Sequence, residues 1–332
     1  MSSPPSSKTS VPLKIPLKTI QSATNNFSDA NLIRESAFRK CYEGKMEIEP
    51  SGQLIDIVAE KQTEKQTKKQ TEKTFLMEVA LLYRLDHKNL VSMVGYCREL
   101  DKLTMEKIIV YKNDQRKGSL DNYLTDSALN WMQRLHICVG VARGLSYIYY
   151  NKKRTFSVIH RDIRSSKILL DEDWRPKLSG FELSMSHPAD LRNGVFHDNF
   201  LGSPGYCDPT YFNDKFVSHK SDMYSFGVVL FEVLCGKTAV LPDGMLLASL
   251  VKFHYKRKTL RGIIDPGLFE QMDQESFKIF TEVAHHCLEE QQSQRPNIHQ
   301  IVKKLDKALE SQQQHVDTLI FEATASKRLL VI

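Results

Sequence analysis

One short segment of the chain carries side chains that could move a proton. His160, Arg161 and Asp162 follow one another in the sequence. A carboxylate such as that of Asp162 can act as a general base, accepting the proton of a hydroxyl group. Any given three-residue sequence occurs by chance in many unrelated proteins, so this tripeptide alone is weak evidence for a reaction. Its meaning depends on the elements that hold it.

Strand patterns dominate the first third of the chain, and helix patterns dominate the rest. Residues 53–61 alternate, which predicts a strand with Lys61 on its inner face beside Ala59. The opposite face would carry Val58 and Glu60. An apolar strand is predicted next, at 107–111, and helices are predicted after it, at 131–150 and 221–234.

The composition is that of a folded globular protein. Of the 332 residues, 41% are hydrophobic and 26% are charged, which excludes disorder as the general state. The formal charge of +6 is mild, and the basic residues are mixed with acidic ones, so no nucleic acid is expected as a partner. The six cysteines show no CxxC pair and are interpreted as reduced, buried thiols.

No segment looks like a membrane span or a secretory signal. The first ten residues are polar and rich in serine and proline, and no apolar run reaches roughly 18 residues. Ser2 rather than glycine follows Met1, which argues against myristoylation. We therefore expect a cytoplasmic protein that could lie at the plasma membrane through a partner.

Several segments in a compatible order resemble those of plant receptor-like kinases and receptor-like cytoplasmic kinases. The resemblance covers about residues 20–310 and rests on the segments Ala23–Ser28, Phe75–Val79, His87–Val91, Gly118–Leu124, His160–Asp162, Lys220–Val229 and Gln294–Pro296. It implies an α+β, two-lobed protein kinase fold, with an antiparallel sheet plus one helix in the N-lobe, a mostly helical C-lobe and a nucleotide cleft between them.

The resemblance also implies a glycine-rich loop, and this chain departs from it. Glycines let backbone amides approach nucleotide phosphates without interference from Cβ atoms. The three positions carry Arg34, Ser36 and Arg39 instead. The arginines could attract phosphate or shield the cleft, and we favour a remodelled loop.

A nucleotide-binding set follows from the same alignment. Lys61 matches the strand lysine that neutralises phosphates, and Glu78 matches the helix glutamate that pairs with this lysine. The pair is expected to be intact. Lys61 could instead be merely the first lysine of a repeat. Further nucleotide-contacting positions are Ala59 and Leu169 as the roof and floor of the adenine site, with Tyr111 and Lys112 beside them.

The positions that should hold magnesium are both substituted. Asp162 and Arg164 match catalytic positions, but Lys167 stands where the family has asparagine and Gly180 where it has the metal-binding aspartate. An ammonium group has no acceptor and repels a cation. Metal ligands are therefore absent from the expected positions, so Mg²⁺ binding is doubtful and ATP binding would be weak.

The expected loss of activity is large. Removing one preorganised electrostatic group costs about 10²- to 10³-fold, so two metal ligands and the loop could remove on the order of 10⁵-fold. Two compensations stay open. Lys167 could act as a built-in cation, or Glu182 or Asp171 could recruit a metal from a shifted position.

The activation segment departs from the family as well. Thr210 stands where a glutamate normally pairs with an arginine that matches Arg295, so this anchor is expected to be missing. Between Met185 and Ser203 the segment offers Ser186 but no threonine or tyrosine, which disfavours activation by phosphorylation there.

Three functions remain open. The first is a catalytically impaired signalling protein, a pseudokinase that acts as scaffold or allosteric partner of other kinases or receptor complexes. The second is an unconventional ATP-dependent Ser/Thr kinase that uses Asp162 as base, and the third is an ATP-binding sensor without catalysis. The first is favoured because substitutions gather at chemical positions while fold-building positions such as Asp222 and Phe181 are kept.

The expected organisation has a kinase core with extensions on both sides. The boundaries are a flexible tail at 1–11, an N-terminal flank at 12–27, an N-lobe at 28–113, a C-lobe at 114–310 and a C-terminal tail at 311–332. A Lys-Gln-Thr repeat at 61–72 favours a solvated loop or frayed helix start. The apolar end Leu329–Ile332 could be a docking segment or the stump of a longer product.

Overall fold

Two compact units, Met1–Arg116 and Lys117–Ile332, make up the chain. The computed structural model describes residues 12–36, 38–48, 52–63, 68–101, 104–199 and 201–329. The predicted flexible tail at 1–11 and the middle of the repeat, 64–67, lie outside these ranges, as does 330–332 of the apolar end. Among the described residues, no helix is both long enough and apolar enough to cross a bilayer.

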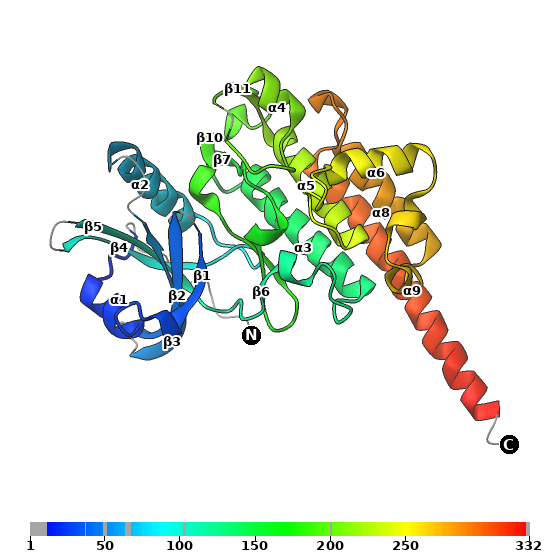
Figure 1. Cartoon of the computed structure of the whole chain (residues 1–332), viewed down its shortest axis with the longest axis horizontal. Helices are drawn as coiled ribbons and strands as arrows, with labels where there is room; N and C mark the ends of the chain where they lie inside the picture. Colours follow the sequence, from blue (N-terminus) through cyan, green and yellow to red (C-terminus); the bar gives the residue numbers. More distant parts are fainter. Residues whose placement is uncertain are drawn as a thin grey trace. The chain divides into compact units, whose positions relative to one another are not determined.

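The first unit is an antiparallel sheet with a helix on each face (Figure 1). Its strand order is β1-β2-β3-β5-β4. The elements are α1 (Leu17–Ala23), η1 (Asp29–Asn31), β1 (Leu32–Glu35), β2 (Arg39–Ile48), β3 (Gln53–Gln62), α2 (Lys68–Arg84), β4 (Met93–Asp101) and β5 (Thr104–Lys112). The predicted strands at 53–61 and 107–111 are confirmed as β3 and β5.

One face of this sheet forms a core with the segment that contains α1. Ile57, Ala59, Ile108 and Val110 pack there with further apolar residues of the sheet and of the segment around α1, namely Ile15, Leu17, Ile20, Met46 and Cys97. Gly44 of β2 allows this close approach, because a Cβ atom there would lie 2.2 Å from the carbonyl oxygen of Ala23. The segment before β1 is therefore a packed part of the unit.

The second unit is mostly helical. Its helices are α3 (Trp131–Tyr150), α4 (Pro209–Asp214), α5 (His219–Cys235), α6 (Leu247–Lys256), α7 (Pro266–Phe269), α8 (Gln274–Cys287) and α9 (Ile298–Leu329). The 3-10 turns are η2 (Leu120–Tyr123), η3 (Ser165–Lys167), η4 (Phe181–Leu183), η5 (Ala189–Leu191), η6 (Leu260–Ile263) and η7 (Gln292–Gln294). The predicted helices at 131–150 and 221–234 are confirmed by α3 and α5.

Short strands in this unit position the loops between the helices. They are β6 (Gly118–Ser119), β7 (Phe156–Ile159), β8 (Ile168–Leu170), β9 (Pro176–Leu178), β10 (Met185–Pro188), β11 (Phe196–His197) and β12 (Phe216–Val217). They form three small sheets, β6-β8-β9, β10-β7 and β11-β12. The predicted α+β class, with a sheet in the first unit and mainly helices in the second, agrees with this architecture.

Local signals explain where the two central helices begin and end. Asn130 and Gln133 form a reciprocal capping box at the start of α3, and Ser218 and Ser221 do the same for α5. Gly236 ends α5 in the left-handed conformation, at φ 64°. Fifteen of the 17 residues of α5 are buried, so this helix forms the centre of the unit.

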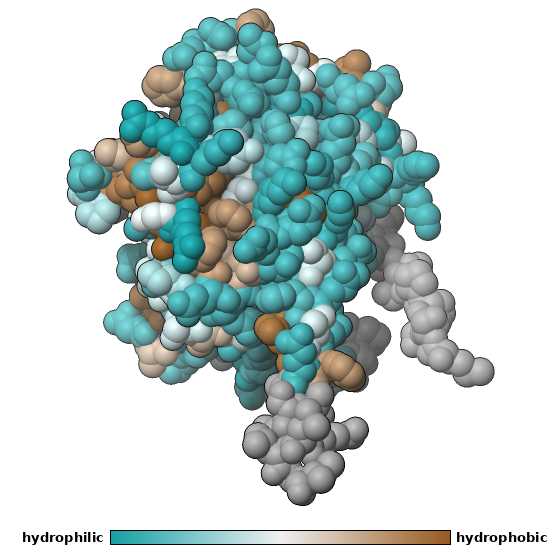
Figure 2. All heavy atoms as spheres, turned by 90° about the vertical axis from the view of Figure 1, so that its right-hand side faces the viewer, coloured by the Kyte–Doolittle hydropathy of each residue, from teal (hydrophilic) through white to brown (hydrophobic). Residues whose placement is uncertain are grey.

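The last helix continues beyond the body of its own unit. α9 packs against α3 and α8 and then runs on past them (Figure 1). Seen from that side, the described surface is mainly hydrophilic with a smaller apolar area (Figure 2). Leu319, Ile320 and Phe321 of α9 are exposed.

Candidate functional site

A buried carboxylate of α5 shapes the loop that contains Asp162. The backbone amides of His160 and Arg161 donate to the carboxylate of Asp222 at 2.7 and 2.8 Å, and the Tyr149 hydroxyl donates to it at 2.9 Å. Arg161 has φ +73°, a strained backbone that these bonds maintain. Burial raises the pKa of Asp222 to about 6, although the three hydrogen bonds oppose this shift.

The buried ring of His160 connects this loop to the segment around Ser179 and Phe181. Its Nε2 donates to the carbonyl of Ser179 at 3.0 Å, and its ring packs edge-on against Phe181. The Nδ1 atom accepts from the amide of Asp162 at 3.3 Å. Because burial lowers the pKa of this imidazole, the neutral ring fits these contacts.

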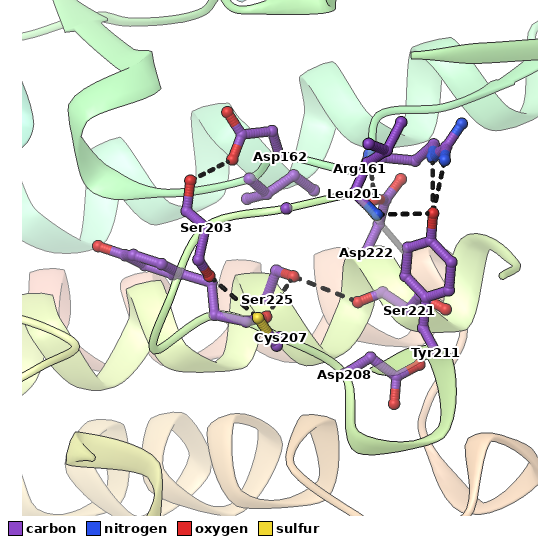
Figure 3. Close-up of a pocket in the computed structure, with 13 residues that line it drawn as sticks. Arg161, Asp162, Leu201, Ser203, Cys207, Asp208, Tyr211, Ser221, Asp222 and Ser225 are labelled. Atoms are coloured by element: carbon purple, nitrogen blue, oxygen red, sulfur yellow. Dashed lines mark hydrogen bonds between the residues drawn. The ribbon is translucent and has the colours of Figure 1, made fainter. Parts of the chain in front are cut away.

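The carboxylate of Asp162 connects its loop to Ser203 of the activation segment (Figure 3). Its side chain is 5% exposed. The Ser203 hydroxyl donates to Oδ1 at 2.8 Å, and Arg164 Nε lies 3.3 Å from Oδ2. The two predicted catalytic positions, Asp162 and Arg164, are therefore adjacent. A pocket beside them is lined by residues 161–163, 201–203, 206–208, 211, 221, 222 and 225.

Lys167 and Gly180, which stand at the two predicted magnesium-ligand positions, lie against each other. Lys167 Nζ lies 2.5 Å from Glu182 Oε1. Gly180 has φ +83°, and a Cβ atom there would lie 2.5 Å from Lys167 Cδ and 2.9 Å from its Cε. The alkyl chain of the lysine therefore occupies the space that a side chain at position 180 would need. Glycine at 180 and lysine at 167 fit each other.

The two carboxylates predicted as substitute metal ligands have other partners. Glu182, one of the residues predicted as a substitute ligand, is paired with the Lys167 ammonium. Asp171 instead accepts from the backbone amides of Asp173 and Arg175. Within the described ranges, no group of three or more His, Cys, Asp or Glu side chains could hold a metal ion.

Lys61 lies on a different face of the sheet from Glu78. Its ammonium is 2.9 Å from Glu106 and 4.7 Å from the ring centre of Phe27, on the side of α1. Glu78 instead pairs with Arg39, at 2.7 Å. The predicted Lys61–Glu78 ion pair is therefore corrected, because the strand pleat that places Lys61 beside Ala59 directs both away from α2.

The other predicted nucleotide-contacting residues are distributed between the two units. Ala59 is fully buried in the core with α1, which argues against an adenine roof at this residue. Tyr111 and Lys112 end β5, where Tyr111 is buried and Lys112 is exposed. Leu169 is a buried residue of β8, opposite Ser119. The roles of these residues in nucleotide binding stay predictions.

The loop that replaces the glycine-rich loop is closed by its own hydrogen bonds. The amide of Ser36 donates to the carbonyl of Arg39 at 2.8 Å. The Ser36 hydroxyl accepts from the amide of Arg39 at 3.1 Å. An amide that such a loop could offer to phosphate is thus bound internally, as a remodelled loop would require.

The predicted loss of the activation-segment anchor is wrong. Arg295 Nη2 lies 2.7 Å from Asp208 Oδ1, with side-chain exposures of 0% and 1%. Thr210 has another role, because its hydroxyl donates to the carbonyl of Glu290 at 3.2 Å. The carboxylate that pairs with Arg295 lies two residues before Thr210, at a position that the prediction did not consider.

The contacts of three charged residues, two in the first unit and one in the second, were missed from the sequence. These residues are Arg39 and Glu60, which face α2, and Asp208, which pairs with Arg295. Alternation already placed Glu60 opposite Lys61. The role of Glu60 could have been predicted only by assigning α2 to the face of β3 that carries Glu60.

The comparisons with known proteins agree with this architecture. The sequence pattern of the protein tyrosine and serine/threonine kinase family matches residues 28–305. The receptor-like protein kinase FERONIA of Arabidopsis thaliana is 36% identical over 301 residues, 89% of this chain and 32% of that protein. ANXUR2 of the same plant is 35% identical over 304 residues, 90% of this chain and 34% of that protein. The chain thus spans about a third of the length of these relatives.

Proposed function

The chain belongs to the protein tyrosine and serine/threonine kinase family, as a domain of the plant receptor-like kinase type, and we propose that it signals without efficient phosphoryl transfer. In this proposal the domain acts as a scaffold or allosteric partner of other kinases or receptor complexes. Its conformation and its surface would then carry the signal.

The contact of Lys167 with Gly180 carries this proposal. Members of the family generally bind ATP with Mg²⁺, and the metal neutralises the charge of the transferred phosphate. In this chain a lysine stands at one predicted ligand position. Its ammonium pairs with Glu182 at 2.5 Å, and its alkyl chain lies against Gly180 at the other predicted position. A dication at the same place would be repelled by the ammonium and would lack the acceptors that it needs.

The surroundings of Asp162 support the same proposal. Its carboxylate accepts from Ser203 and lies beside Arg164, so it already braces the loop. In this proposal the carboxylate of Asp162 has a structural role that does not need a metal.

A second candidate is an unconventional Ser/Thr kinase. It is favoured by the preserved loop geometry, because Asp222 still holds the amides of His160 and Arg161. In this reading Asp162 is the base and Lys167 provides the positive charge that a metal otherwise provides. A third reading, an ATP sensor, needs nucleotide binding without transfer.

Phosphate transfer from radiolabelled ATP by the purified chain separates these readings. We expect the wild type to incorporate no more label than Asp162→Ala, with or without Mg²⁺. Incorporation that disappears in Asp162→Ala would establish the kinase instead. A thermal shift with millimolar ATP in the absence of transfer would select the sensor.

A location at the plasma membrane is proposed only through a partner. The relatives FERONIA and ANXUR2 are receptor-like protein kinases by name, which supports receptor complexes as the class of partner. Co-purification of the chain with a receptor kinase from plant membranes, lost on salt washing, would support this location.

A further inference from the structure

The pleat of β2 and β3 places Arg39, Cys41 and Glu60 on one face of the sheet. Cys41 pairs directly with Glu60 in the antiparallel register, and directly opposite side chains share a face. Arg39 lies two residues from Cys41 and therefore on the same face. Lys61 lies on the other face, where it meets Glu106.

Arg39 joins this face of the sheet to α2 through a forked contact. Its Nη2 lies 2.7 Å from Glu78 Oε2, and its Nη1 lies 3.2 Å from Glu78 Oε1. Nη1 also donates to Glu60 Oε1. Two parallel bonds to one carboxylate fix both distance and orientation, which a lysine ammonium does less well.

Burial makes this contact energetically important. The side chain of Glu78 is 2% exposed, and those of Arg39 and Glu60 are each 13% exposed. A carboxylate buried to this extent is costly unless a cation lies against it. Arg34 Nη2, 3.9 Å from Glu60 Oε2, adds a second positive charge beside the acidic pair.

We propose that Arg39 is the positioning residue for α2, acting from β2 in the place of a strand lysine. Glu60 takes the α2-facing position on β3, and the arginine bridges it to Glu78. The backbone of Arg39 is fixed as well, because Ser36 binds its amide and its carbonyl. This inference is independent of whether the chain transfers phosphate.

Hydrogen exchange on the full chain tests the proposal. Amides of α2 from Phe75 to Leu82 are followed in wild type, Arg39→Gln, Arg39→Lys and Lys61→Gln. Arg39→Gln should speed their exchange by at least about tenfold, because the Glu78 carboxylate loses a buried cation. Arg39→Lys should restore part of the protection.

Lys61→Gln is the matched control, since it removes a cation of the same sheet from the opposite face. It should leave α2 exchange within about twofold of the wild type. Equal loosening by Lys61→Gln and Arg39→Gln would overturn the proposal, as would unchanged exchange in Arg39→Gln.

A charge exchange covers the case in which Arg39→Gln fails to fold. Arg39→Glu alone should loosen α2, and adding Glu78→Arg should return exchange to within about threefold of the wild type. Protection of α5 amides in the same samples reports whether the second unit is intact. If the double variant is no better protected than Arg39→Glu, the arginine does not act through Glu78 and the proposal fails.

Discussion

At the scale of single residues, the most informative substitutions are those that accommodate each other. Gly180 has a left-handed backbone and a neighbour, Lys167, where a Cβ atom would lie. A side chain added at position 180 would therefore meet Lys167 unless the lysine moved. Lysine at 167 and glycine at 180 are therefore sterically matched.

Gly180→Ala tests this contact, and Gly244→Ala is its matched control. Both glycines have φ +83°, but a Cβ atom at Gly244 would have no neighbour within 4 Å. Gly244→Ala should lower the free energy of unfolding by about 1–2 kcal/mol because of the backbone alone. Gly180→Ala should cost about 1–2 kcal/mol more, since Lys167 must move. Urea unfolding measures both.

Adding Lys167→Ala should remove the extra cost at Gly180. The remaining loss should then match that of Gly244→Ala within about 0.5 kcal/mol, apart from the effect of Lys167→Ala measured alone. Equal losses for the two glycine variants while Lys167 is present would show that the lysine does not fill the position.

Elements are held together by buried charges that are not always where an alignment expects them. Asp208 begins α4 as its N-cap, accepting from the amide of Thr210, and also pairs with Arg295. The same carboxylate accepts from Gln292 Nε2 at 2.9 Å. One side chain thus links the end of the activation segment to the segment before α9.

Asp208→Ala should destabilise the chain strongly. Breaking a buried ion pair by removing one partner costs about 3–5 kcal/mol, because Arg295 would keep a buried charge. Thr210→Ala is the control, because position 210 is where the family pattern places the anchor. This variant should lower the free energy of unfolding by at most about 1 kcal/mol. Urea unfolding compares the two, and similar losses would contradict the assignment of the anchor to Asp208.

Glu232 gives a pH-dependent contact between α5 and the activation segment. It accepts from the Tyr206 hydroxyl at 2.7 Å and from the amide of Ala239 at 3.0 Å. Burial raises the pKa of this carboxyl to about 7. Because the pKa is higher in the folded chain, the folded chain binds more protons than the unfolded chain in this range. The free energy of unfolding therefore decreases as the pH rises from about 4.5 to 7, where the buried carboxyl loses its proton.

The stability of Glu232→Gln relative to the wild type should therefore increase as the pH rises. Its free energy of unfolding relative to wild type should increase between pH 5 and pH 8 by an amount on the order of 3 kcal/mol, because the amide stays neutral. Urea unfolding at a series of pH values measures the difference. A difference that stays constant, or that falls with pH, would refute the assignment.

At the scale of the whole molecule, the sequence was sufficient for the fold class but not for every pairing. Alternation in 53–61 identified β3 and its faces, because a strand buried on one side needs that pattern. It could not tell which face α2 covers, and so Lys61 was paired with Glu78. Spacing within one segment carries no information on where a distant helix packs.

Asp208 and Gly180 illustrate the other limits. Thr210 at the aligned position predicted a missing anchor, but Asp208, two residues earlier, pairs with Arg295, and only the geometry reveals this. The absence of both metal ligands stays a prediction from positions 167 and 180, and it rests on the unchanged spacing of the flanking residues. The contact between Lys167 and Gly180 depends on the direction of the lysine side chain, which the sequence does not specify.

The most direct test of the central claim is whether Mg²⁺ strengthens ATP binding. Binding of ATP is measured by titration with Mg²⁺ and with EDTA, for the wild type and for Lys167→Asn/Gly180→Asp. We predict that the wild type binds ATP equally weakly, or not at all, in both conditions, while the double variant gains Mg²⁺-dependent binding of about tenfold or more. Wild-type ATP binding that tightens tenfold with Mg²⁺ would contradict the account.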